Sequence, residues 1–451
     1  MSPLRLSVLL VLLSSLLAPS TALRSSTLLL ARSPQSVSLS AVPGTPVTAW
    51  AATLAAQTAS DAARAATLAT GPRDPPPASA VDAAKKGPRR SFVPIAPGRQ
   101  LLSIPSYVAR ARLGTPAQAL LVAIDPSNDA AWVPCAACAG CARAPSFDPT
   151  RSSTYRPVRC GAPQCSQAPA PSCPGGLGSS CAFNLSYAAS TFQALLGQDA
   201  LALHDDVDAV AAYTFGCLHV VTGGSVPPQG LVGFGRGPLS FPSQTKDVYG
   251  SVFSYCLPSY KSSNFSGTLR LGPAGQPKRI KTTPLLSNPH RPSLYYVNMV
   301  GIRVGGRPVP VPASALAFDP TSGRGTIVDA GTMFTRLSAP VYAAVRDVFR
   351  SRVRAPVAGP LGGFDTCYNV TISVPTVTFS FDGRVSVTLP EENVVIRSSS
   401  GGIACLAMAA GPPDGVDAAL NVLASMQQQN HRVLFDVANG RVGFSRELCT
   451  A

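Results

Sequence analysis

Two stretches that lie far apart in the sequence share one pattern, an apolar strand that ends in an acidic residue. The first reads LLVAID and ends at Asp125, and the second reads GTIVD and ends at Asp329, 204 residues later. About a hundred residues after each acid comes a short apolar run ending in a small residue, LVG at 231–233 and VLA at 422–424. Self-similarity on this scale indicates two copies of one structural unit. We therefore expect two similar lobes that face each other, with the two acids meeting on the axis between them.

The composition between these landmarks favours strands joined by turns. Hydrophobic residues make up 45 % of the chain and charged residues only 13 %, and there are 38 Gly and 44 Pro. This profile is typical of an all-β protein with short strands. One amphipathic helix is expected at 340–354, where a proline begins an apolar pattern with helical spacing. The clearest strands are predicted at 107–114, 119–125, 268–272, 295–306 and 432–444.

The first 22 residues have the pattern of a secretory signal peptide. Arg5 supplies a positive start, residues 6–17 form an apolar core, and small residues at 20–22 suit cleavage. A membrane anchor is the alternative interpretation, but the apolar run is shorter than the roughly 20 residues that span a bilayer. No later stretch is long and apolar enough to span one, so we expect a mature protein that is not bound to a membrane.

Residues 23–92 are predicted to be a propeptide. They contain no Cys, are rich in Ala, Ser, Thr and Pro, and include a helix-like segment at 47–70. The segment ends in a basic linker at 85–90, KKGPRR, of the kind that proteases cut; a plain disordered linker is the alternative. Residues 1–92 hold nine Lys/Arg and three Asp/Glu, so their removal lowers the net charge from +15 to +9. The two lobes are expected at 93–275 and 276–451.

Cysteine usage indicates disulfide bonds. All twelve cysteines follow residue 134, and an even number downstream of a secretory signal implies six disulfides. A metal site is the alternative at 135–141, where the spacing is C-x2-C-x2-C. Zinc sites need paired Cys knuckles or spaced His ligands, and none of the four His lies nearby, so disulfides are favoured and no metal is expected. Three sequons, at Asn184, Asn264 and Asn369, could carry glycans.

Several longer motifs resemble those of a known family, the pepsin-like aspartic proteases. The resemblance is to the plant nepenthesin-like branch, which also holds xylanase-inhibitor proteins and a chloroplast nucleoid protein, and it runs from about residue 106 to residue 449. It implies an all-β, two-lobed fold with a deep cleft and endopeptidase activity at acid pH without a cofactor. The motifs read AIDPSNDAAWVPC, GLVGFGRGPLSFPSQT, GTIVDAGTMFTRL, FDTCY and NVLASMQQQNHRVLFDVANGRVGFS.

The resemblance assigns the chemistry to Asp125 and Asp329. Two carboxyls about 3 Å apart cannot both ionise, so they share a proton and activate a water between them. One then acts as general base toward the water and the other as general acid toward the peptide carbonyl. By the same resemblance Tyr187 is the tyrosine of a flap that closes over substrate, and the Trp132 indole donates to its hydroxyl.

The motifs also depart from the family pattern. The first usually reads D-T-G-S and here reads DPSN at 125–128, whereas the second usually reads D-[ST]-G-T and here reads DAGT at 329–332. Asn128 and Thr332 can still bond the outer carboxylate oxygens. The hydroxyls that normally lock the two loops together are absent, because Pro126 and Ala330 occupy those positions. We therefore expect a slow protease.

The resemblance also implies a disulfide pattern and a set of partners. The substrates are expected to be proteins or peptides and the protein a monomer. The pairs implied are Cys135–Cys138, Cys141–Cys217, Cys160–Cys181, Cys165–Cys173, Cys256–Cys449 and Cys367–Cys405.

Two other functions compete with the protease. One is a non-catalytic binding protein or inhibitor of cell-wall hydrolases with the same fold, favoured by the altered motifs. The other is a nucleic-acid-binding protein, favoured by the basic charge, although Lys and Arg are scattered apart from KRIK at 278–281. A basic secreted protein that associates with acidic wall polymers explains that charge equally well. We expect secretion to the apoplast or cell wall; the sequence does not separate these from the vacuole or a plastid.

Overall fold

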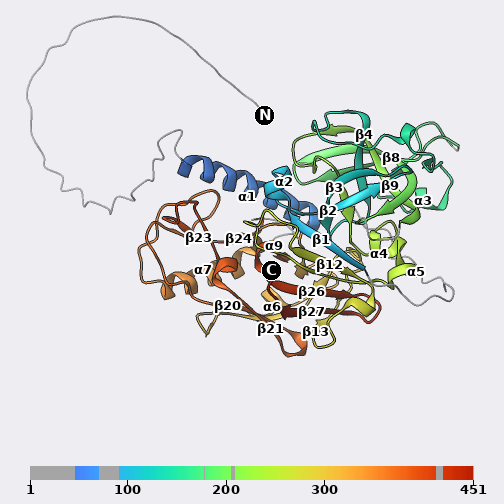
Figure 1. Ribbon diagram of the computed structural model, residues 1–451. Helices are drawn as coiled ribbons and strands as arrows, with labels where there is room; N and C mark the ends of the chain where they lie inside the picture. Colours follow the sequence, from blue (N-terminus) through green and yellow to red (C-terminus); the bar gives the residue numbers. More distant parts are fainter. Residues whose placement is uncertain (1–45, 71–90, 177, 205–208, 413–419, 450–451) are drawn as a thin grey trace, which may run out of the picture. The chain divides into compact units, whose positions relative to one another are not determined.

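The computed structural model describes residues 46–70, 91–176, 178–204, 209–412 and 420–449 (Figure 1). The predicted signal peptide and the basic linker at 85–90 lie outside these residues. The helix-like segment of the predicted propeptide forms α1 (Pro46–Thr70), where proline lies at the start and alanine is the commonest residue. Strand β1 begins at Ser91, so the predicted propeptide boundary at residue 92 falls inside a paired strand.

Strands dominate the described residues, as the composition predicts, and most of them belong to one large sheet. Its strands from the first part of the chain are β1 (Ser91–Pro97), β2 (Tyr107–Leu113), β3 (Gln118–Asp125), β4 (Ala131–Ala139), β5 (Arg156–Pro157), β6 (Pro171–Ser172), β7 (Ala182–Tyr187), β8 (Ser190–Ala202), β9 (Val210–Thr222), β10 (Leu231–Gly233), β11 (Val252–Cys256), β12 (Gly267–Leu271) and β13 (Lys281–Pro284). It also includes β26 (His431–Asp436) and β27 (Arg441–Arg446). Because β26 pairs antiparallel with β11, this sheet joins the end of the chain to the first half.

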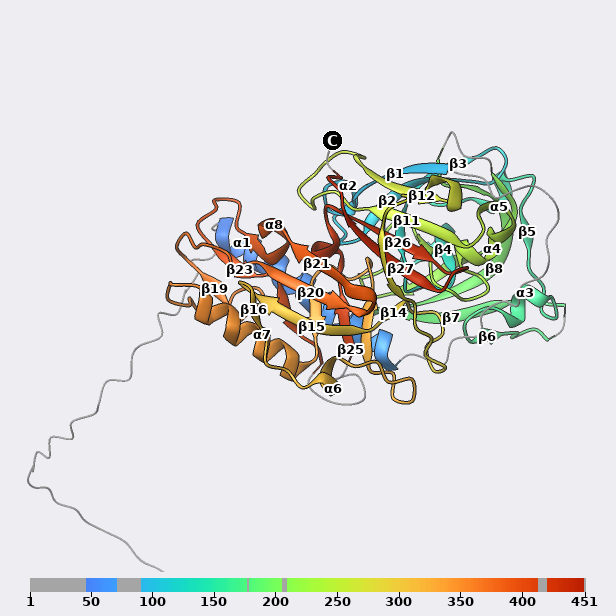
Figure 2. The same cartoon turned by 90° about the horizontal axis from the view of Figure 1, so that it is seen from below.

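Three smaller sheets are built from the second half. One contains β14 (Tyr296–Val297), β17 (Gly325–Val328), β18 (Thr335–Leu337), β24 (Met408–Ala410) and β25 (Leu420–Leu423). The others contain β15 (Met299–Val304), β16 (Arg307–Pro308), β20 (Val377–Phe381) and β21 (Val385–Leu389), and β19 (Cys367–Tyr368), β22 (Val395–Arg397) and β23 (Ala404–Leu406). The predicted amphipathic helix is α7 (Ala339–Arg352), which packs against β15 (Figure 2).

The remaining helices are short. They are α2 (Gly98–Leu102), α3 (Pro163–Ser166), α4 (Phe241–Gln244), α5 (Lys246–Tyr249), α6 (Ala313–Leu316), α8 (Glu391–Val394) and α9 (Ser425–Gln428). Among the described helices, none is both long and apolar enough to cross a bilayer.

The repeat seen in the sequence is a repeat in the structure. In the first half β10 runs parallel to β3, with Gly233 opposite Asp125, and antiparallel to β4. In the second half β25 runs parallel to β17 and antiparallel to β18. The Asp329 N–H, one residue beyond β17, donates to the carbonyl of Leu423 at 3.0 Å. Each acid therefore stands at the end of a central strand that is held between its neighbours, in an all-β fold of two similar lobes.

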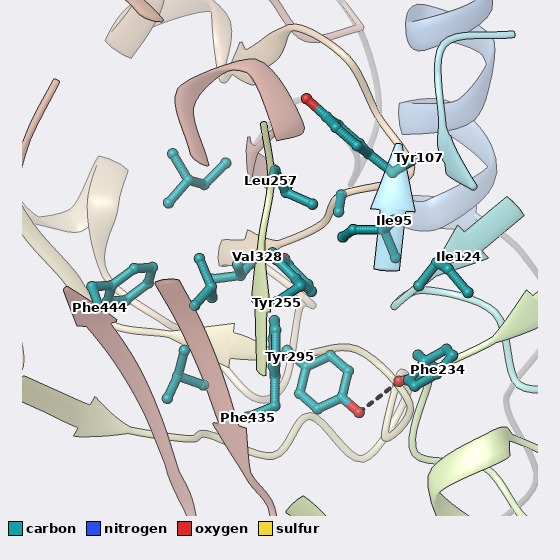
Figure 3. Packing of buried hydrophobic residues seen from close by; sticks show 14 of the residues in the cluster. Ile95, Tyr107, Ile124, Phe234, Tyr255, Leu257, Tyr295, Val328, Phe435 and Phe444 are labelled. Atoms are coloured by element: carbon teal, nitrogen blue, oxygen red, sulfur yellow. Dashed lines mark hydrogen bonds between the residues drawn. The ribbon is translucent and has the colours of Figure 1, made fainter. Parts of the chain in front are cut away.

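Aromatic residues fill the core where strands of the two halves meet (Figure 3). Phe435 on β26 stacks on Phe253 of β11 with ring centroids 4.8 Å apart, and Tyr295 packs edge-on against Phe435. The Tyr295 hydroxyl donates to the carbonyl of Phe234, just beyond β10, at 2.7 Å. Burying rings of this size contributes heavily to the stability of the core, and the hydroxyl has the partner that burial requires.

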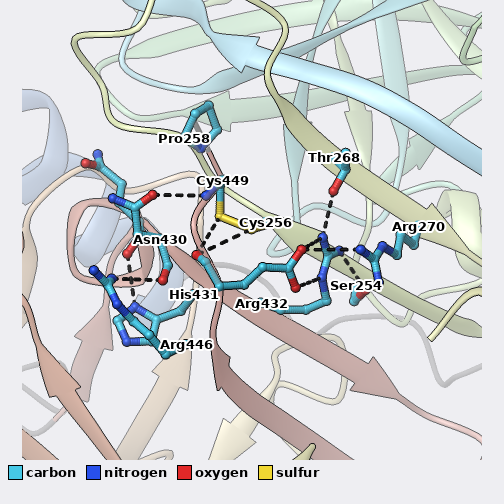
Figure 4. The surroundings of a disulfide bond; sticks show 12 residues. Ser254, Cys256, Pro258, Thr268, Arg270, Asn430, His431, Arg432, Arg446 and Cys449 are labelled. Carbon is cyan, nitrogen blue, oxygen red and sulfur yellow. Dashed lines mark hydrogen bonds and ion pairs between the residues drawn. A yellow bond between two sulfur atoms is a disulfide. The ribbon is translucent and has the colours of Figure 1, made fainter. Parts of the chain in front are cut away.

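The end of the chain is fixed to β11 by a disulfide and a buried charge network (Figure 4). Cys449 bonds Cys256, the last residue of β11. Beside it the fully buried Arg432 guanidinium pairs with Glu447 at 2.6 Å and donates to Ser254 and Thr268. A buried guanidinium is tolerated because its donors have partners, including a carboxylate.

Four of the six implied disulfide pairs are wrong. Cys256–Cys449 and Cys367–Cys405 form as expected, but the observed pairs in the first lobe are Cys135–Cys217, Cys138–Cys141, Cys160–Cys173 and Cys165–Cys181. The physical reason for the first exchange is strand pairing. Strands β4 and β9 are parallel neighbours, which brings the Cα atoms of Cys135 and Cys217 to 5.4 Å. Cys138 is then left to close the short turn with Cys141.

Candidate active site

Asp125 and Asp329 are fully buried and are held in the same way by their own loops. The Oδ1 atom of each accepts the backbone N–H two residues further on, from Ser127 at 2.9 Å and from Gly331 at 3.0 Å. The outer oxygen, Oδ2, accepts from the third residue, from the Asn128 amide at 2.8 Å and from the Thr332 hydroxyl at 2.6 Å. The loops thus orient both carboxyls, with an amide in one lobe where the other has a hydroxyl.

One guanidinium, that of Arg64 on α1, lies against both acids. Its Nη2 atom donates to Asp125 Oδ1 at 2.6 Å and to Asp329 Oδ1 at 3.3 Å, and Nε donates to Asp329 Oδ2 at 3.2 Å. Nη2 also contacts the Ser127 hydroxyl. Arg64 is only 5 % exposed, so these bonds form in a nearly water-free environment. A cation therefore lies between the two carboxyls and contacts both of them.

The charge of Arg64 favours the ionised form of Asp329. Burial alone lowers the pKa of an arginine, but Asp125 and Asp329 raise the pKa of Arg64 well above its ordinary value. Burial likewise raises the pKa of Asp329, yet the Arg64 charge and the bonds from Thr332 and Gly331 bring that pKa below its usual range. Arg64 and Asp329 each stabilise the charged form of the other, and no proton is needed to hold the site together.

Helix α1 reaches the acids by docking one face on the second lobe. Leu54, Thr58, Asp61 and Arg64 are spaced four and three residues apart and are all buried, which is the spacing of a single helical face. Leu54 belongs to an apolar cluster with Met333, Phe334 and Phe364 among others. The buried face of α1 is therefore polar near the acids, where Asp61 and Arg64 lie, and apolar further away, at Leu54.

Two glycines permit this close approach of α1. The Thr58 hydroxyl donates to the carbonyl of Gly362 at 2.9 Å. Gly362 and Gly363 have φ angles of +57° and +86°, and a Cβ at Gly363 would overlap the Thr58 side chain. Only glycine satisfies both the backbone conformation and the spacing at this position.

A second polar contact of α1 lies one helical turn before Arg64. The Asp61 carboxylate accepts the backbone N–H of Met333 at 3.1 Å and that of Phe334 at 2.8 Å. The Arg336 guanidinium on β18 donates to the carbonyl of Thr58. Burial raises the pKa of Asp61 to about 6, while Arg336 and the two N–H groups act in the opposite direction.

The predicted flap is the hairpin of β7 and β8, and it covers the first acid. The Tyr187 hydroxyl donates to Asp125 Oδ2 at 3.4 Å, and the Arg64 guanidinium lies 5.2 Å from the centre of the Tyr187 ring. Burial raises the pKa of Tyr187, so its hydroxyl remains a donor. The turn contains Ala188 at φ +48° where glycine is usual, a strained conformation for a residue with a side chain.

The expected bond from Trp132 to Tyr187 does not form. The two rings are in contact at 5.4 Å in an edge-to-face arrangement, but the Trp132 Nε1 atom has no hydrogen-bond partner among the described residues. The reason is that the Tyr187 hydroxyl points to Asp125 and the indole meets the tyrosine by its ring. Trp132 therefore packs against the flap tyrosine and does not bond it.

A cavity of about 820 Å³ lies between the flap and the acid-bearing loop. Its wall includes Ser127, Tyr187, Arg291 and the C-terminal part of α1 around Arg64.

The predicted glycosylation residues Asn184, Asn264 and Asn369 are all exposed, and Asn184, on β7, also lines this cavity. Cys135, Cys138 and Cys141 are all in disulfides.

Four residues of the site escaped the sequence analysis: Asp61, Arg64, Ser127 and Arg336. A signal for two of them was present, because Asp61 and Arg64 are the only charged residues in the 25-residue stretch 46–70. They also share a helical face with apolar residues, where charges are unexpected unless they are paired. Ser127 and Arg336 stand inside recognised motifs without any pattern of their own.

Comparisons with known proteins agree with this architecture. The family models for the xylanase inhibitor N-terminal and C-terminal regions match residues 107–273 and 294–446. Among solved structures, soybean basic 7S globulin superposes with a TM-score of 0.61 at 25 % identity, covering 79 % of this chain and 96 % of that one. Conglutin gamma from lupine seeds has a TM-score of 0.64 at 22 % identity, covering 80 % and 98 %, and shares the fold.

Curated relatives are aspartyl proteases by name. Aspartyl protease 25 of Oryza sativa subsp. japonica is 48 % identical, over 80 % of this chain and 85 % of that protein. Aspartyl protease AED3 of Arabidopsis thaliana is 49 % identical, over 80 % and 81 %. Nepenthesin-2 of Nepenthes gracilis is 32 % identical, over 76 % and 78 %. With two acids meeting between similar lobes under a flap, and with relatives at this level of identity, the chain belongs to the plant family of pepsin-like aspartic proteases.

Proposed function

We propose that this chain is an aspartic endopeptidase that cleaves proteins or peptides at acid pH and is held latent by its own helix α1. The observation that carries the proposal is the position of one Arg64 nitrogen, which contacts the inner oxygens of both Asp125 and Asp329. Two carboxyls within reach of one nitrogen are also within reach of one water. Paired acids that share a proton and a water are the machinery of metal-free peptide hydrolysis.

The reaction follows once Arg64 leaves. With one proton shared by Asp125 and Asp329, the ionised carboxyl takes a proton from the water as its oxygen attacks the peptide carbonyl carbon. The protonated carboxyl donates to the carbonyl oxygen, and a tetrahedral intermediate forms. A proton then passes to the leaving nitrogen as the C–N bond breaks. Tyr187, which bonds the outer oxygen of Asp125, covers this site from the flap.

Latency is the second part of the proposal. Residues 23–92 act as a propeptide whose helix α1 blocks the acids until the basic linker at 85–90 is cut or acid weakens the Arg64 contacts. The supporting observation is burial, because Arg64 is 5 % exposed and Asp61 is 1 % exposed in the docked helix. A substrate cannot reach acids that are covered in this way.

The proposed setting is extracellular. A signal peptide at 1–22 and six disulfides support secretion into an oxidising compartment, the apoplast or cell wall. We propose a monomer that carries glycans on its exposed sequons and acts on proteins, with its basic surface free to associate with acidic wall polymers.

A non-catalytic binding protein is the second candidate. It is favoured by the altered loop with Pro126 and Ser127, and by family models that are described as those of xylanase inhibitors. Against it stand two acids that each keep an orienting bond on both carboxylate oxygens. The purified protein can be tested for inhibition of a cell-wall glycoside hydrolase.

The deciding experiment is proteolysis before and after activation. The full chain is exposed to pH 3–5 and then given a denatured protein, with and without a statine-type active-site inhibitor. We expect slow cleavage that begins after acid exposure, is blocked by the inhibitor and is absent in Asp329→Asn. The matched control is Asp347→Asn, which removes an exposed acid on α7 and should leave the rate unchanged. Cleavage that peaks near pH 8, or none at any pH after α1 is removed, would contradict the proposal.

A further inference from the structure

A cluster of hydrogen-bond donors lies on the wall of the second lobe, next to the acids. The backbone N–H groups of Met333 and Phe334 follow directly after Thr332, which holds Asp329. The side chain of Arg336 lies two residues further on and is buried, with only 6 % of its surface exposed. These three donors come from one short segment, 333–336, and all belong to the part of the chain that remains when α1 departs.

In the structure a carboxylate occupies this cluster. Each oxygen of Asp61 accepts one of the two backbone N–H groups, and Oδ1 also accepts from the Gln57 amide at 2.9 Å. All of these partners are donors. The segment 333–336 therefore recognises a carboxylate in a two-pronged manner, with one donor for each oxygen.

Arg336 adds the positive charge and is held in place without α1. Its Nη1 atom donates to the carbonyl of Ala410 on β24 at 3.1 Å, and Nη2 donates to the carbonyl of Thr58 on α1. The Nε atom is buried and has no partner among the described residues. Burial lowers the pKa of Arg336, and the charge of Asp61 raises it again.

When α1 leaves, the Thr58 carbonyl and the Asp61 carboxylate leave with it. The two N–H groups and the guanidinium then face the cleft without these acceptors, and buried donors need water or another acceptor in their place. In the docked helix burial raises the pKa of Asp61, whereas Arg336 and the two N–H groups act to lower it. A carboxylate that enters from an open cleft keeps more of its water and meets the same donors.

We propose that residues 333–336 form a subsite for the acidic side chain of a substrate, so that the enzyme prefers to cut next to Asp or Glu. This proposal rests on the proposed protease function and adds a substrate class to it. On α1, Asp61 and Arg64 are three residues apart, about 4.5 Å along the axis. An extended peptide rises about 3.3 Å per residue, so the acidic residue lies one or two residues from the scissile bond.

The chemistry of the donors predicts the order of preference. A glutamate offers two acceptor oxygens to the two N–H groups, as Asp61 does. A glutamine of the same shape offers one oxygen and turns an NH2 group toward a donor, which leaves a buried N–H unpaired. A lysine at this position is repelled by Arg336. We expect cleavage efficiency to fall about tenfold or more from Glu to Gln, and further for Lys.

The test is a set of peptides with one scissile bond and a Glu, Gln or Lys placed in turn at each of three positions on either side. The full chain is cut in the linker, freed of α1 by acid and assayed for kcat/KM at pH 5. One position should show the Glu preference. Arg336→Gln should reduce the Glu-to-Gln ratio to within about twofold, and Arg336→Lys should retain part of it. Arg303→Gln, which removes an exposed charge on β15, should keep the full ratio.

A binding measurement keeps the subsite testable apart from catalysis. A peptide of residues 46–70 is titrated into the α1-free protein beside its Asp61→Asn version, and the Asn version should bind at least tenfold more weakly. Equal Glu and Gln efficiencies at all six positions would overturn the subsite while leaving the protease intact. If no peptide is cut, the proposed function fails, and equal binding of the two helices would then overturn the subsite as well. The wild-type ratios and the binding pair decide the matter if Arg336→Gln does not fold.

Discussion

The loops 125–128 and 329–332 share the backbone bond from the third-residue N–H to the acid and carry different side chains. At the third position the first loop has Ser127 and the second has Gly331. The Ser127 hydroxyl donates to Asp125 Oδ1 at 2.9 Å, so the first acid gains a donor that the second lacks. A Cβ at Gly331 would overlap the Arg64 guanidinium and lie 2.8 Å from Asp125 Oδ1. Two lobes that approach so closely leave room for one side chain beside the acids, and here the first lobe supplies it.

The comparison teaches that a two-fold arrangement need not be symmetric in chemistry. The bond from the third-residue N–H to Oδ1 is the same in both loops. The next N–H differs, because that of Thr332 donates to Asp329 Oδ2 at 3.0 Å whereas that of Asn128 donates to the carbonyl of Asp125 at 3.4 Å. The side chains differ at every remaining position of the loops, with Pro126 and Asn128 in the first and Ala330 and Thr332 in the second. One backbone bond is therefore common to the two acids, and the other bonds that orient them differ between the lobes.

The largest expected effect comes from removing either acid. Asp125→Asn and Asp329→Asn should each lower kcat/KM by at least about a thousandfold, because one group is lost as base or as acid and the pair no longer shares a proton. The melting temperature of each variant serves as the control for folding. If one of the two variants retains most of the activity, the acids do not act as a pair and the comparison between the loops loses its meaning.

Exchanging the residues at the third positions of the two loops should lower kcat/KM by very different amounts. Gly331→Ser forces a side chain into the space next to Asp125 and should lower kcat/KM on the order of a hundredfold, since a displacement of about 1 Å of a reacting group is enough. Ser127→Gly removes one donor and should change kcat/KM by less than about tenfold. The pair is measured with one peptide at several pH values. Equal losses in both variants would show that the loops are interchangeable at this position.

The docking of α1 should depend on pH through two acids with opposite signs. Burial raises the pKa of Asp61 to about 6, so its contribution to docking is present at low pH and lost as the pH rises through about 6. For Asp329 burial raises the pKa, but Arg64 and the loop donors lower it overall, so its contribution is present at higher pH and lost as the pH falls. The Asp61 effect therefore changes up to about pH 6, whereas the Asp329 effect is lost only below the ordinary range of a carboxyl.

Asp61→Asn removes the first of these effects and should leave the second in place. The inhibition constant of a 46–70 peptide with the natural sequence should rise as the pH is raised toward about 6, and that of the Asp61→Asn peptide should stay nearly constant over the same range. Both constants should rise at more acid pH, where Asp329 takes up a proton. Gln57 and Arg336, which also face Asp61, do not titrate in this range. Parallel curves for the two peptides would show that Asp61 does not contribute to the pH dependence.

The smallest expected effect is a gain. Pro126→Thr combined with Ala330→Thr restores a hydroxyl in each loop and returns a backbone N–H where proline has none. If the loops hold the acids loosely, the double variant should raise kcat by a few-fold over the natural chain, with each single change giving less. No gain in the double variant, measured with the same peptide and pH, would mean that the remaining bonds of Asn128 and Thr332 already hold the acids in place.

The sequence predicted those parts of the structure that follow from patterns along the strands. β2, β3 and β12 lie within a residue or two of the predicted runs, because apolar residues closed by Gly or followed by Asp125 leave little choice. The run at 295–306 contains two strands, β14 and β15, and the run at 432–444 corresponds to β26 and β27. The repeat of strand and acid predicted that Asp125 and Asp329 would meet. Both predictions need only the pattern of residues along each strand and the spacing of the two motifs in the sequence.

Other parts depend on distances that a sequence does not contain. The sulfur atoms of Cys160, Cys165 and Cys173 all lie within 4.8 Å of one another. Because these cysteines are so close together in the fold, their order in the sequence does not show which of them are bonded. Arg64 is far from the acids in the chain, and only the docking of α1 brings it to them. The orientation of Trp132 depends on where the Tyr187 hydroxyl points, which depends in turn on Asp125.

The disulfide from Cys256 to Cys449 has a consequence for a protein that is proposed to work among proteases. Every peptide bond between residues 257 and 448 lies inside the covalent ring that this bond closes. A single nick in any exposed loop of that span would therefore leave two pieces that are still covalently tied and still paired along β11 and β26. The pieces would re-form their contacts as an intramolecular event, at an effective concentration that no pair of separate chains in dilute solution could match. An enzyme built in this way can be cut and remain one molecule.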